Sequence, residues 1–158
     1  MRVLGIDPGL ATTGFALLEN NALLEYGVIL TPAKQELPKR LEQIASELNI
    51  LINKYKPHTA GIEELFFNTN VKTAIAVAQA RGVILYVLAK NNIPMASYTP
   101  PEVKIAVCGY GKADKSQVQT MVKRLLGLAA IPKPDDAADA LAIAICHSTA
   151  YKLKSLNV

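Results

Sequence analysis

Acidic residues at three places in the chain have the types and spacing that suit metal-assisted chemistry. Asp7 ends a short apolar stretch, just before a Pro-Gly turn in "GIDPGLATTG", and Glu63 ends the apolar stretch of "TAGIEE". Asp136 and Asp139 are three residues apart at the start of a predicted helix, on one face of one turn. If the strands ending at Asp7 and Glu63 are parallel neighbours, both carboxylates lie at the edge where open α/β sheets bind ligands. All four acids would then meet at one point.

Like charges this close repel each other unless a cation or a helix N-terminus offsets them. Because all candidate ligands are oxygens, they favour a hard cation such as Mg²⁺ or Mn²⁺ over zinc. Two acid-held Mg²⁺ ions suit phosphoryl transfer, one activating water and the other stabilising the leaving oxygen. Local roles are the alternative: Asp7 would serve the turn, and the acids from Asp135 to Asp139 would cap a helix.

Positive charge is concentrated in one stretch of a chain whose formal net charge is +4. Residues 99–133 contain only two acidic residues, Glu102 and Asp114. Their six basic residues are Lys104, Lys112, Lys115, Lys123, Arg124 and Lys133. A polyanion-binding face needs such a distribution, although a solvated surface would also show it. Together with the acids, the stretch points to nucleic acid as the substrate.

Strands and helices are predicted to alternate along the chain, which is the order needed to bring the four acids to one edge of a sheet. The predicted strands are residues 2–7, 13–20, 21–30, 59–64 and 93–99, with a hairpin turn at Asn20 and Asn21. Helices are expected at 37–55, where apolar residues recur every three or four positions, and at 71–92. Beyond Thr99 the pattern is helical, interrupted by an exposed glycine-containing loop at 108–115, and the last helix begins near residue 134. Asp114 and Gln117 have capping-box spacing.

This order predicts an α/β fold in which a mixed five-stranded sheet, an antiparallel β-meander plus parallel strands, is flanked by helices. At 158 residues we expect one domain, residues 1–158. Cys108 and Cys146 lack CxxC spacing, which indicates neither a disulfide framework nor a zinc site and fits a reducing cytoplasm. Without a secretory signal, and with an apolar run broken by Gln79 and Arg81, the chain is expected to be soluble and not membrane-bound.

Five blocks of sequence carry a resemblance to a known family. They are "GIDPGLATTGFA", "IEELFFNTN", "AQARGV", "EVKIAVCGYGKADKSQVQTMV" and "DDAADALAIAICH". In order and spacing they resemble the RuvC family of Holliday junction resolvases, which have the ribonuclease H-like fold, over nearly the whole chain. "GIDPG" alone is also similar to actin-like ATPases and sugar kinases, but those are far longer and need two such domains.

The resemblance implies a Mg²⁺-dependent homodimeric endonuclease, acting in DNA recombination and repair, that nicks two strands of a four-way DNA junction symmetrically. Two Mg²⁺ ions per subunit are expected, with Mn²⁺ as a substitute, and a branch-migration motor complex is expected as a partner. Two alternatives remain open at this stage. One is a related nuclease acting on RNA or other branched DNA, and the other is a junction-binding module without catalysis.

Carried over by position, the catalytic and metal-binding acids would be Asp7, Glu63, Asp136 and Asp139. Glu64 and Asp135 are acidic neighbours of two of them. Since strand residues alternate between faces, only one of Glu63 and Glu64 can join Asp7, and Glu63 is the choice that the motif favours.

The family's lysines correspond to Lys104 and Lys115, which would contact the backbone phosphate or stabilise its developing charge. Lys112 lies in the same basic stretch and is expected to contact DNA. Phe66 is similar to the family's aromatic that stacks on an unpaired base, while either Phe66 or Phe67 packs into the core instead. His58 and His147 are expected to be structural.

The long helix over residues 71–91 is apolar on more than one face and contains Gly82, which costs about 1 kcal/mol against alanine. In the resembling family the corresponding helix lies at the dimer interface. The alternative is that it only lies between the sheet and the C-terminal helices.

Overall fold

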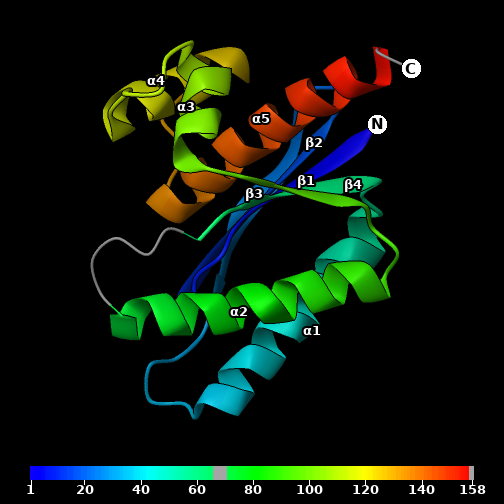
Figure 1. The fold of residues 1–158 in the computed structure, drawn as a ribbon, viewed down its shortest axis with the longest axis vertical. Coiled ribbons are helices and arrows are strands. Elements are labelled where there is room, and N and C mark those ends of the chain that lie inside the picture. The colour runs from blue at the N-terminus through cyan, green and yellow to red at the C-terminus, as the bar shows by residue number, and fades with distance from the viewer. Residues whose placement is uncertain (66–70, 157–158) are drawn as a thin grey trace.

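Five strands form one mixed sheet in the computed structural model, which describes residues 1–65 and 71–156 of the chain (Figure 1). They are β1 (Arg2–Asp7), β2 (Thr12–Glu19), β3 (Ala22–Leu30), β4 (Thr59–Glu63) and β5 (Met95–Tyr98). Their order across the sheet is β3-β2-β1-β4-β5. The first three strands are antiparallel neighbours, and β1, β4 and β5 are parallel. Both the predicted meander and the parallel part are therefore confirmed.

The β2–β3 hairpin turns at Asn20 and Asn21, as predicted, with φ angles of 52° and 69°. Asparagine tolerates this left-handed conformation better than most residues. The hairpin brings the two longest strands together on one side of β1. On the other side of β1, parallel pairing with β4 runs from Val3–Thr59 to Ile6–Ile62, so the carboxyl ends of these two strands lie side by side.

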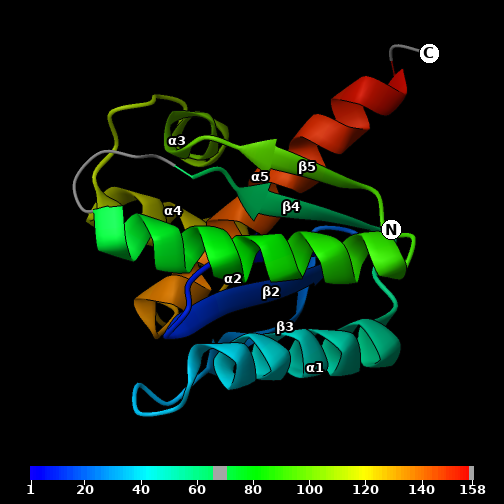
Figure 2. The same ribbon diagram turned by 60° about the horizontal axis from the view of Figure 1, so that its bottom comes forward.

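Helices cover both faces of the sheet (Figure 2). They are α1 (Leu37–Tyr55), α2 (Val71–Lys90), α3 (Pro100–Cys108), α4 (Lys115–Leu125) and α5 (Asp135–Leu156). Helix α5 crosses one face, over β1, β2 and β4, with α3 and α4 beside it. Helices α1 and α2 pack against each other and form the other hydrophobic core with the opposite sheet face.

Alternation along β1 assigns its side chains to these two layers. Leu4 and Ile6 belong to the core shared with α1 and α2, whereas Val3 belongs to the core shared with α5. Gly5 and Asp7 have the same parity as Val3, so Asp7 lies on the α5 face. The strand therefore presents its one acidic residue to the helix that carries the other acids.

Local signals account for the helix ends. Helix α1 has a proline in its first turn, buries Ile44, Leu48 and Ile52, and ends at Lys56, whose left-handed conformation directly precedes Pro57. The capping box of Asp114 and Gln117 at the start of α4 is present, as predicted. A second capping box, which the sequence analysis did not identify, starts α3.

One expectation about the long apolar helix is wrong. We expected the run around Gln79 and Arg81 to fall short of a membrane span, yet residues Thr73–Lys90 are long and apolar enough by length and composition. Only 22% of this segment is buried within the described part of the chain. Most of the segment is therefore at least partly exposed in this structure.

Candidate active site

Two adjacent strands carry the same short pattern, Gly-Ile-acid. In the parallel pairing of β1 and β4, Gly5 lies opposite Gly61 and Ile6 opposite Ile62. Asp7 and Glu63 follow these pairs directly, at the carboxyl ends of their strands. Since both acids are two residues beyond their glycines, the pleat places glycine and acid on the same face. The pattern thus brings two carboxylates together under α5.

The glycines let α5 approach the sheet closely enough to add its own acids. A Cβ at Gly5 would collide with the backbone of Ala140, and one at Gly14 of β2 would collide with the carbonyl group of Asp136. At Gly61 the obstacle would be the His147 side chain, at 2.6 Å. No Cβ fits between sheet and helix at these three positions. The first turn of α5 therefore lies directly over the ends of β1 and β2.

A buried polar network fixes α5 along its axis. His147 is 2% exposed, and its Nε2 lies 2.7 Å from the Thr59 hydroxyl while its Nδ1 lies 2.8 Å from the Tyr98 hydroxyl. These partners come from β4 and β5, so the histidine ties the helix to both parallel strands. As expected, His147 has a structural place in the fold, and it helps to set where Asp136 and Asp139 lie over the sheet.

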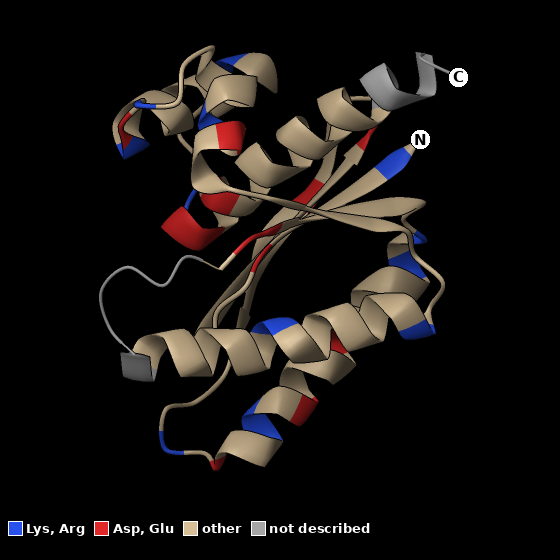
Figure 3. Cartoon of the chain, in the orientation of Figure 1, with Lys and Arg blue, Asp and Glu red and all other residues tan. Residues whose placement is uncertain are grey.

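The electrostatics show that the four acids are close together. The pKa of Asp7 is raised from 3.8 to about 8, chiefly by burial, then by the charges of Glu63, Asp139 and Asp136, and by a hydrogen bond with Glu63. Burial is also the main cause that raises the pKa of Glu63 and of Asp139. Figure 3 shows acidic segments of the central strands beside the acidic start of α5.

The neighbouring acids, Glu64 and Asp135, have different surroundings, although Asp135 shares Lys115 with Asp139. Glu64 is exposed, and its backbone N–H donates to the carbonyl of Tyr98. Asp135 accepts hydrogen bonds from Lys133 and Gln119, which lower its pKa, and it does not contribute to the raised pKa of Asp7. These surroundings favour Glu63 and Asp136 over their neighbours as members of the acidic group.

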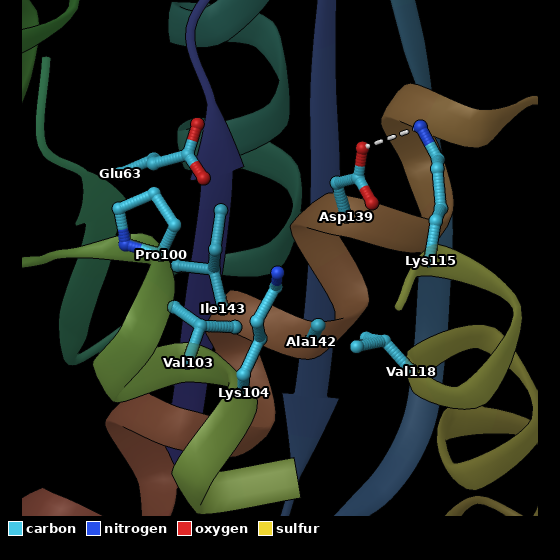
Figure 4. A pocket seen from close by; sticks show the side chains of 9 residues that line it. All are labelled: Glu63, Pro100, Val103, Lys104, Lys115, Val118, Asp139, Ala142 and Ile143. Atoms are coloured by element: carbon cyan, nitrogen blue, oxygen red, sulfur yellow. Dashed lines mark hydrogen bonds and ion pairs between the residues drawn. The ribbon is translucent and has the colours of Figure 1, made fainter. Parts of the chain in front are cut away.

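Two lysines face the acidic group from α3 and the start of α4. Lys104 and Lys115 line a pocket of about 180 Å³ together with Glu63 and Asp139. In Figure 4 the Lys104 amine points into the space between Glu63 and Asp139. The Lys115 Nζ lies 3.1 Å from Asp139 Oδ2 and 3.4 Å from Asp135 Oδ2. The structure thus brings both predicted lysines to the acids.

The other two predicted DNA contacts lie differently. Lys112 is exposed in the turn between α3 and α4 and does not line this pocket. Phe66 and Phe67 lie outside the described residues. Both cysteines are free, so the expectation of no disulfide between Cys108 and Cys146 is confirmed.

The donor set fits a hard divalent cation. Four carboxylates approach one another, and two of them share a hydrogen bond that requires one to hold a proton at neutral pH. A divalent ion removes this repulsion and takes oxygen ligands. Among the described residues, however, no three acidic, histidine or cysteine side chains are already arranged to hold one ion. Lys115 holds Asp139 by an ion pair. The chemistry of the residues present therefore suits a hard divalent cation, although they are not already arranged around one.

Comparison with solved structures identifies the class of fold to which this chain belongs. The fold matches "T. thermophilus RuvC in complex with Holliday junction substrate" with a TM-score of 0.91 and 31% identity, covering 98% of this chain and 96% of that chain. The yeast mitochondrial Holliday junction resolvase Ydc2 matches with a TM-score of 0.63 at 18% identity, which shows the fold alone. The sheet order and the helices on both faces are those of the ribonuclease H-like fold.

Sequence comparison identifies the family within that class. Residues 3–147 match the family described as "Crossover junction endodeoxyribonuclease RuvC". A protein of that name from Syntrophomonas wolfei is 56% identical, over 98% of this chain and 92% of its own length. Another, from Halothermothrix orenii, is 54% identical over 97% of this chain and 95% of its own length. The chain belongs to the RuvC family of crossover junction endodeoxyribonucleases.

Sequence reasoning missed the residues that bring the acids together. Gly5, Gly14 and Gly61 allow α5 to approach the sheet closely. The repetition of Gly-Ile-acid in two predicted strands could have identified Gly5 and Gly61 from the sequence. Arg40 of α1 was also missed, although it lines a second depression beside Asp136. It lies outside the basic stretch, so the charge distribution did not draw attention to it.

Proposed function

We propose that this chain cuts four-way DNA junctions by hydrolysing one phosphodiester bond per subunit, with Asp7, Glu63, Asp136 and Asp139 as ligands of Mg²⁺. The single domain of residues 1–158 carries the whole site, and the protein acts in the cytoplasm. The observation that supports the proposal is the Asp7 carboxyl, buried among three other acids and held at a pKa of about 8 by burial and their charges. Such a group is costly to keep without a cation.

Two Mg²⁺ ions, or Mn²⁺ in their place, would activate a water molecule and stabilise the leaving oxygen when bound. The chain's own residues supply the rest. The Lys104 amine faces the acids across the pocket and contacts an oxygen of the scissile phosphate, whose developing charge it stabilises. Lys115 shields the charge of Asp139 and contacts the same strand. Lys112, exposed on the adjoining turn, adds a contact to the DNA backbone, and Phe66 stacks on an unpaired base.

The proposed oligomer is a two-fold dimer joined through α2. Ile75 is 53% exposed and Tyr86 63% exposed on the outer face of this helix. Between them lies Gly82, where a Cβ would meet nothing within 4 Å in the described part of the chain. Helix α2 packs on α1 and the opposite sheet face, not beneath the C-terminal helices. A second copy would cover this face, and two copies match a reaction that needs two symmetric nicks.

Substituting the acids tests the catalytic assignment. Asp7→Asn, Glu63→Gln, Asp136→Asn and Asp139→Asn should each abolish cleavage of a synthetic four-way junction in Mg²⁺ and retain binding in EDTA, since affinity comes from basic residues. The matched controls are Glu64→Gln and Asp135→Asn, which should cut at close to the wild-type rate. A member of the four that still cuts normally would be removed from the site.

The substrate panel separates the alternatives. Wild-type protein should cut the four-way junction in preference to a linear duplex, another branched DNA or an RNA–DNA hybrid, and EDTA should stop the reaction. Preference for the hybrid or for other branches would indicate the related nuclease activity. Junction binding without cleavage under Mg²⁺ and Mn²⁺ would indicate a binding module.

The lysines act on rate more than on affinity in this proposal. Lys104→Ala or Lys115→Ala should slow single-turnover cleavage more than it weakens junction binding. Equal losses in both measurements would make them ordinary backbone contacts. Pull-down with a branch-migration motor complex, with and without junction DNA, tests the remaining partner.

A further inference from the structure

A second depression borders the acidic group on the side away from Lys104 and Lys115. It has a volume of about 500 Å³ and is lined by Asp136, by the β1–β2 turn, by Arg40 of α1 and by the first turns of α2. The two depressions have no described lining residue in common, yet each contains one of the acids of α5. The acidic group therefore lies between two hollows, and only the first has a place in the proposed reaction.

Arg40 is held in place at this hollow. Its Nε donates to the Thr31 hydroxyl at 2.8 Å, and Thr31 is 6% exposed. Thr31 in turn binds the β1–β2 turn, because its hydroxyl donates to the carbonyl of Leu10 and its N–H to that of Ala11. Within the described part of the chain, the terminal nitrogens of the Arg40 guanidinium have no hydrogen-bond partner. The arginine thus offers a pre-positioned fork whose outer donors are available to a ligand.

The rest of the lining indicates what kind of ligand fits. Leu10, Ala11, Ala76 and Val77 present apolar groups, whereas Arg40 is the only cationic residue among the described residues that line the hollow. A free anion would gain nothing from the apolar part. A nucleotide has both components, since its sugar and base bury apolar surface and its phosphate accepts from a guanidinium. The volume lies in the usual range of sites for small organic groups.

The position of the second hollow relative to the acidic group indicates which nucleotide would reach it. A DNA strand whose scissile phosphate lies at the acidic group must continue in both directions from it. If one direction follows the pocket lined by Lys104 and Lys115, the second hollow beside Asp136 is available to the other. We propose that this hollow binds the nucleotide next to the scissile phosphate on the Asp136 side, with Arg40 contacting its backbone phosphate. The inference rests on the proposed junction cleavage and adds a subsite to it.

The test begins with a salt series for junction binding in EDTA, using wild type, Arg40→Gln and Arg40→Lys. Loss of one phosphate contact should weaken binding about tenfold and reduce the slope of log affinity against log salt by about 0.7 to 0.9. Arg40→Lys should retain most of the slope. The control is Lys54→Gln at the far end of the same helix, which removes the same charge and should change neither quantity.

Neutral phosphates locate the contact. Once the cut position is mapped, a methylphosphonate is placed on one side of the scissile phosphate and then on the other. On one side only, neutralising the phosphate should weaken wild-type binding and have no further effect on Arg40→Gln. Additive losses on both sides would overturn the inference.

A second variant keeps the test valid if the arginine variants fold poorly. Ala76→Leu fills the hollow without changing charge, and should slow cleavage while leaving the salt slope unchanged. If wild type does not cut the junction, the proposed function fails. If wild type cuts but Arg40→Gln and Ala76→Leu both behave like Lys54→Gln, only the subsite is excluded.

Discussion

Helices α5 and α2 are the two longest helices that the structure describes, and both are rich in apolar residues. They differ in how much of their surface is buried. Helix α5 buries almost every residue from Ala137 to Ser148 against the sheet and α3. Helix α2 buries 22% of Thr73–Lys90 and exposes Ile75 and Tyr86 to more than half. A helix that is apolar all round is normally buried. Helix α5 therefore completes the chain's own core, whereas α2 leaves an apolar surface exposed, which we propose is covered by a second copy.

The glycines that face α5 and the glycine within α2 also differ in their surroundings. Those that face α5 have helix atoms where a Cβ would be, whereas Gly82 of α2 has open space. The first kind allows a contact within the chain, and we infer that the second allows one between chains.

Gly14→Ala should be the most damaging of the glycine substitutions. The new Cβ would meet the carbonyl group of Asp136, so α5 must move away from the acids of β1 and β4. We expect unfolding free energy to fall by about 1–3 kcal/mol and cleavage to fall much further than stability explains. Denaturant titration and single-turnover cleavage measure the two effects. Wild-type cleavage in this variant would contradict the close approach of α5.

Gly82→Glu should separate the dimer without unfolding the subunit. The charge enters the exposed apolar face of α2 and meets no obstacle in its own chain. Light scattering at micromolar concentration should show monomers, and junctions should receive single nicks in place of pairs. Ser46→Glu, exposed on α1, introduces the same charge as a control. Wild-type protein that is monomeric and still makes paired nicks would exclude α2 as the interface.

The acids under α5 should make metal-free protein sensitive to pH. Because the folded-state pKa of Asp7 is raised from 3.8 to about 8, the folded state retains a proton that the unfolded state loses. Unfolding free energy in EDTA should therefore fall as pH rises from about 4 to about 8, by at most about 1.4 kcal/mol per pH unit. Asp7→Asn should flatten this dependence, and Mg²⁺ should stabilise wild type at pH 8. Equal pH slopes for wild type and variant would argue against a buried acidic group.

Gly82→Ala gives the smallest effect, with the opposite sign to Gly14→Ala. With no neighbour within 4 Å, the methyl group is tolerated within the subunit and removes the cost of glycine in a helix. Unfolding free energy should rise by about 0.5–1 kcal/mol, measured with the dimer dissociated by dilution. A weaker dimer in the same variant would show that the partner helix approaches closely at this position.

Much of the fold could be predicted because local signals agree with one another. The stripe from Leu37 to Tyr55, the asparagine turn and the capping box at Asp114 each lie where the sequence placed them. The parallel pairing of β1 and β4 was only a condition in the sequence argument, because strand order depends on contacts between distant residues. The acids could be proposed from position and resemblance, but their approach depends on glycine contacts that no local pattern displays.

What sequence could not show is which apolar surface remains exposed. The exposed face of α2 and the hollow beside Arg40 both arise from how α1 and α2 pack on the sheet. By composition, α2 and α5 are similar apolar helices. They differ in the fraction of residues that is buried, which depends on tertiary packing.

Two of the three elements that carry the acids lie at opposite ends of the chain, since β1 is the first element and α5 the last. During synthesis the first strands emerge long before the helix that must cover them. Asp7 is therefore exposed to solvent until α5 has been made and has docked through His147 and the glycines. On the proposed assignment, a nascent chain without α5 would hold only Asp7 and Glu63 of the acidic group and could not cut DNA. Cleavage would then begin only after the subunit has completed its core.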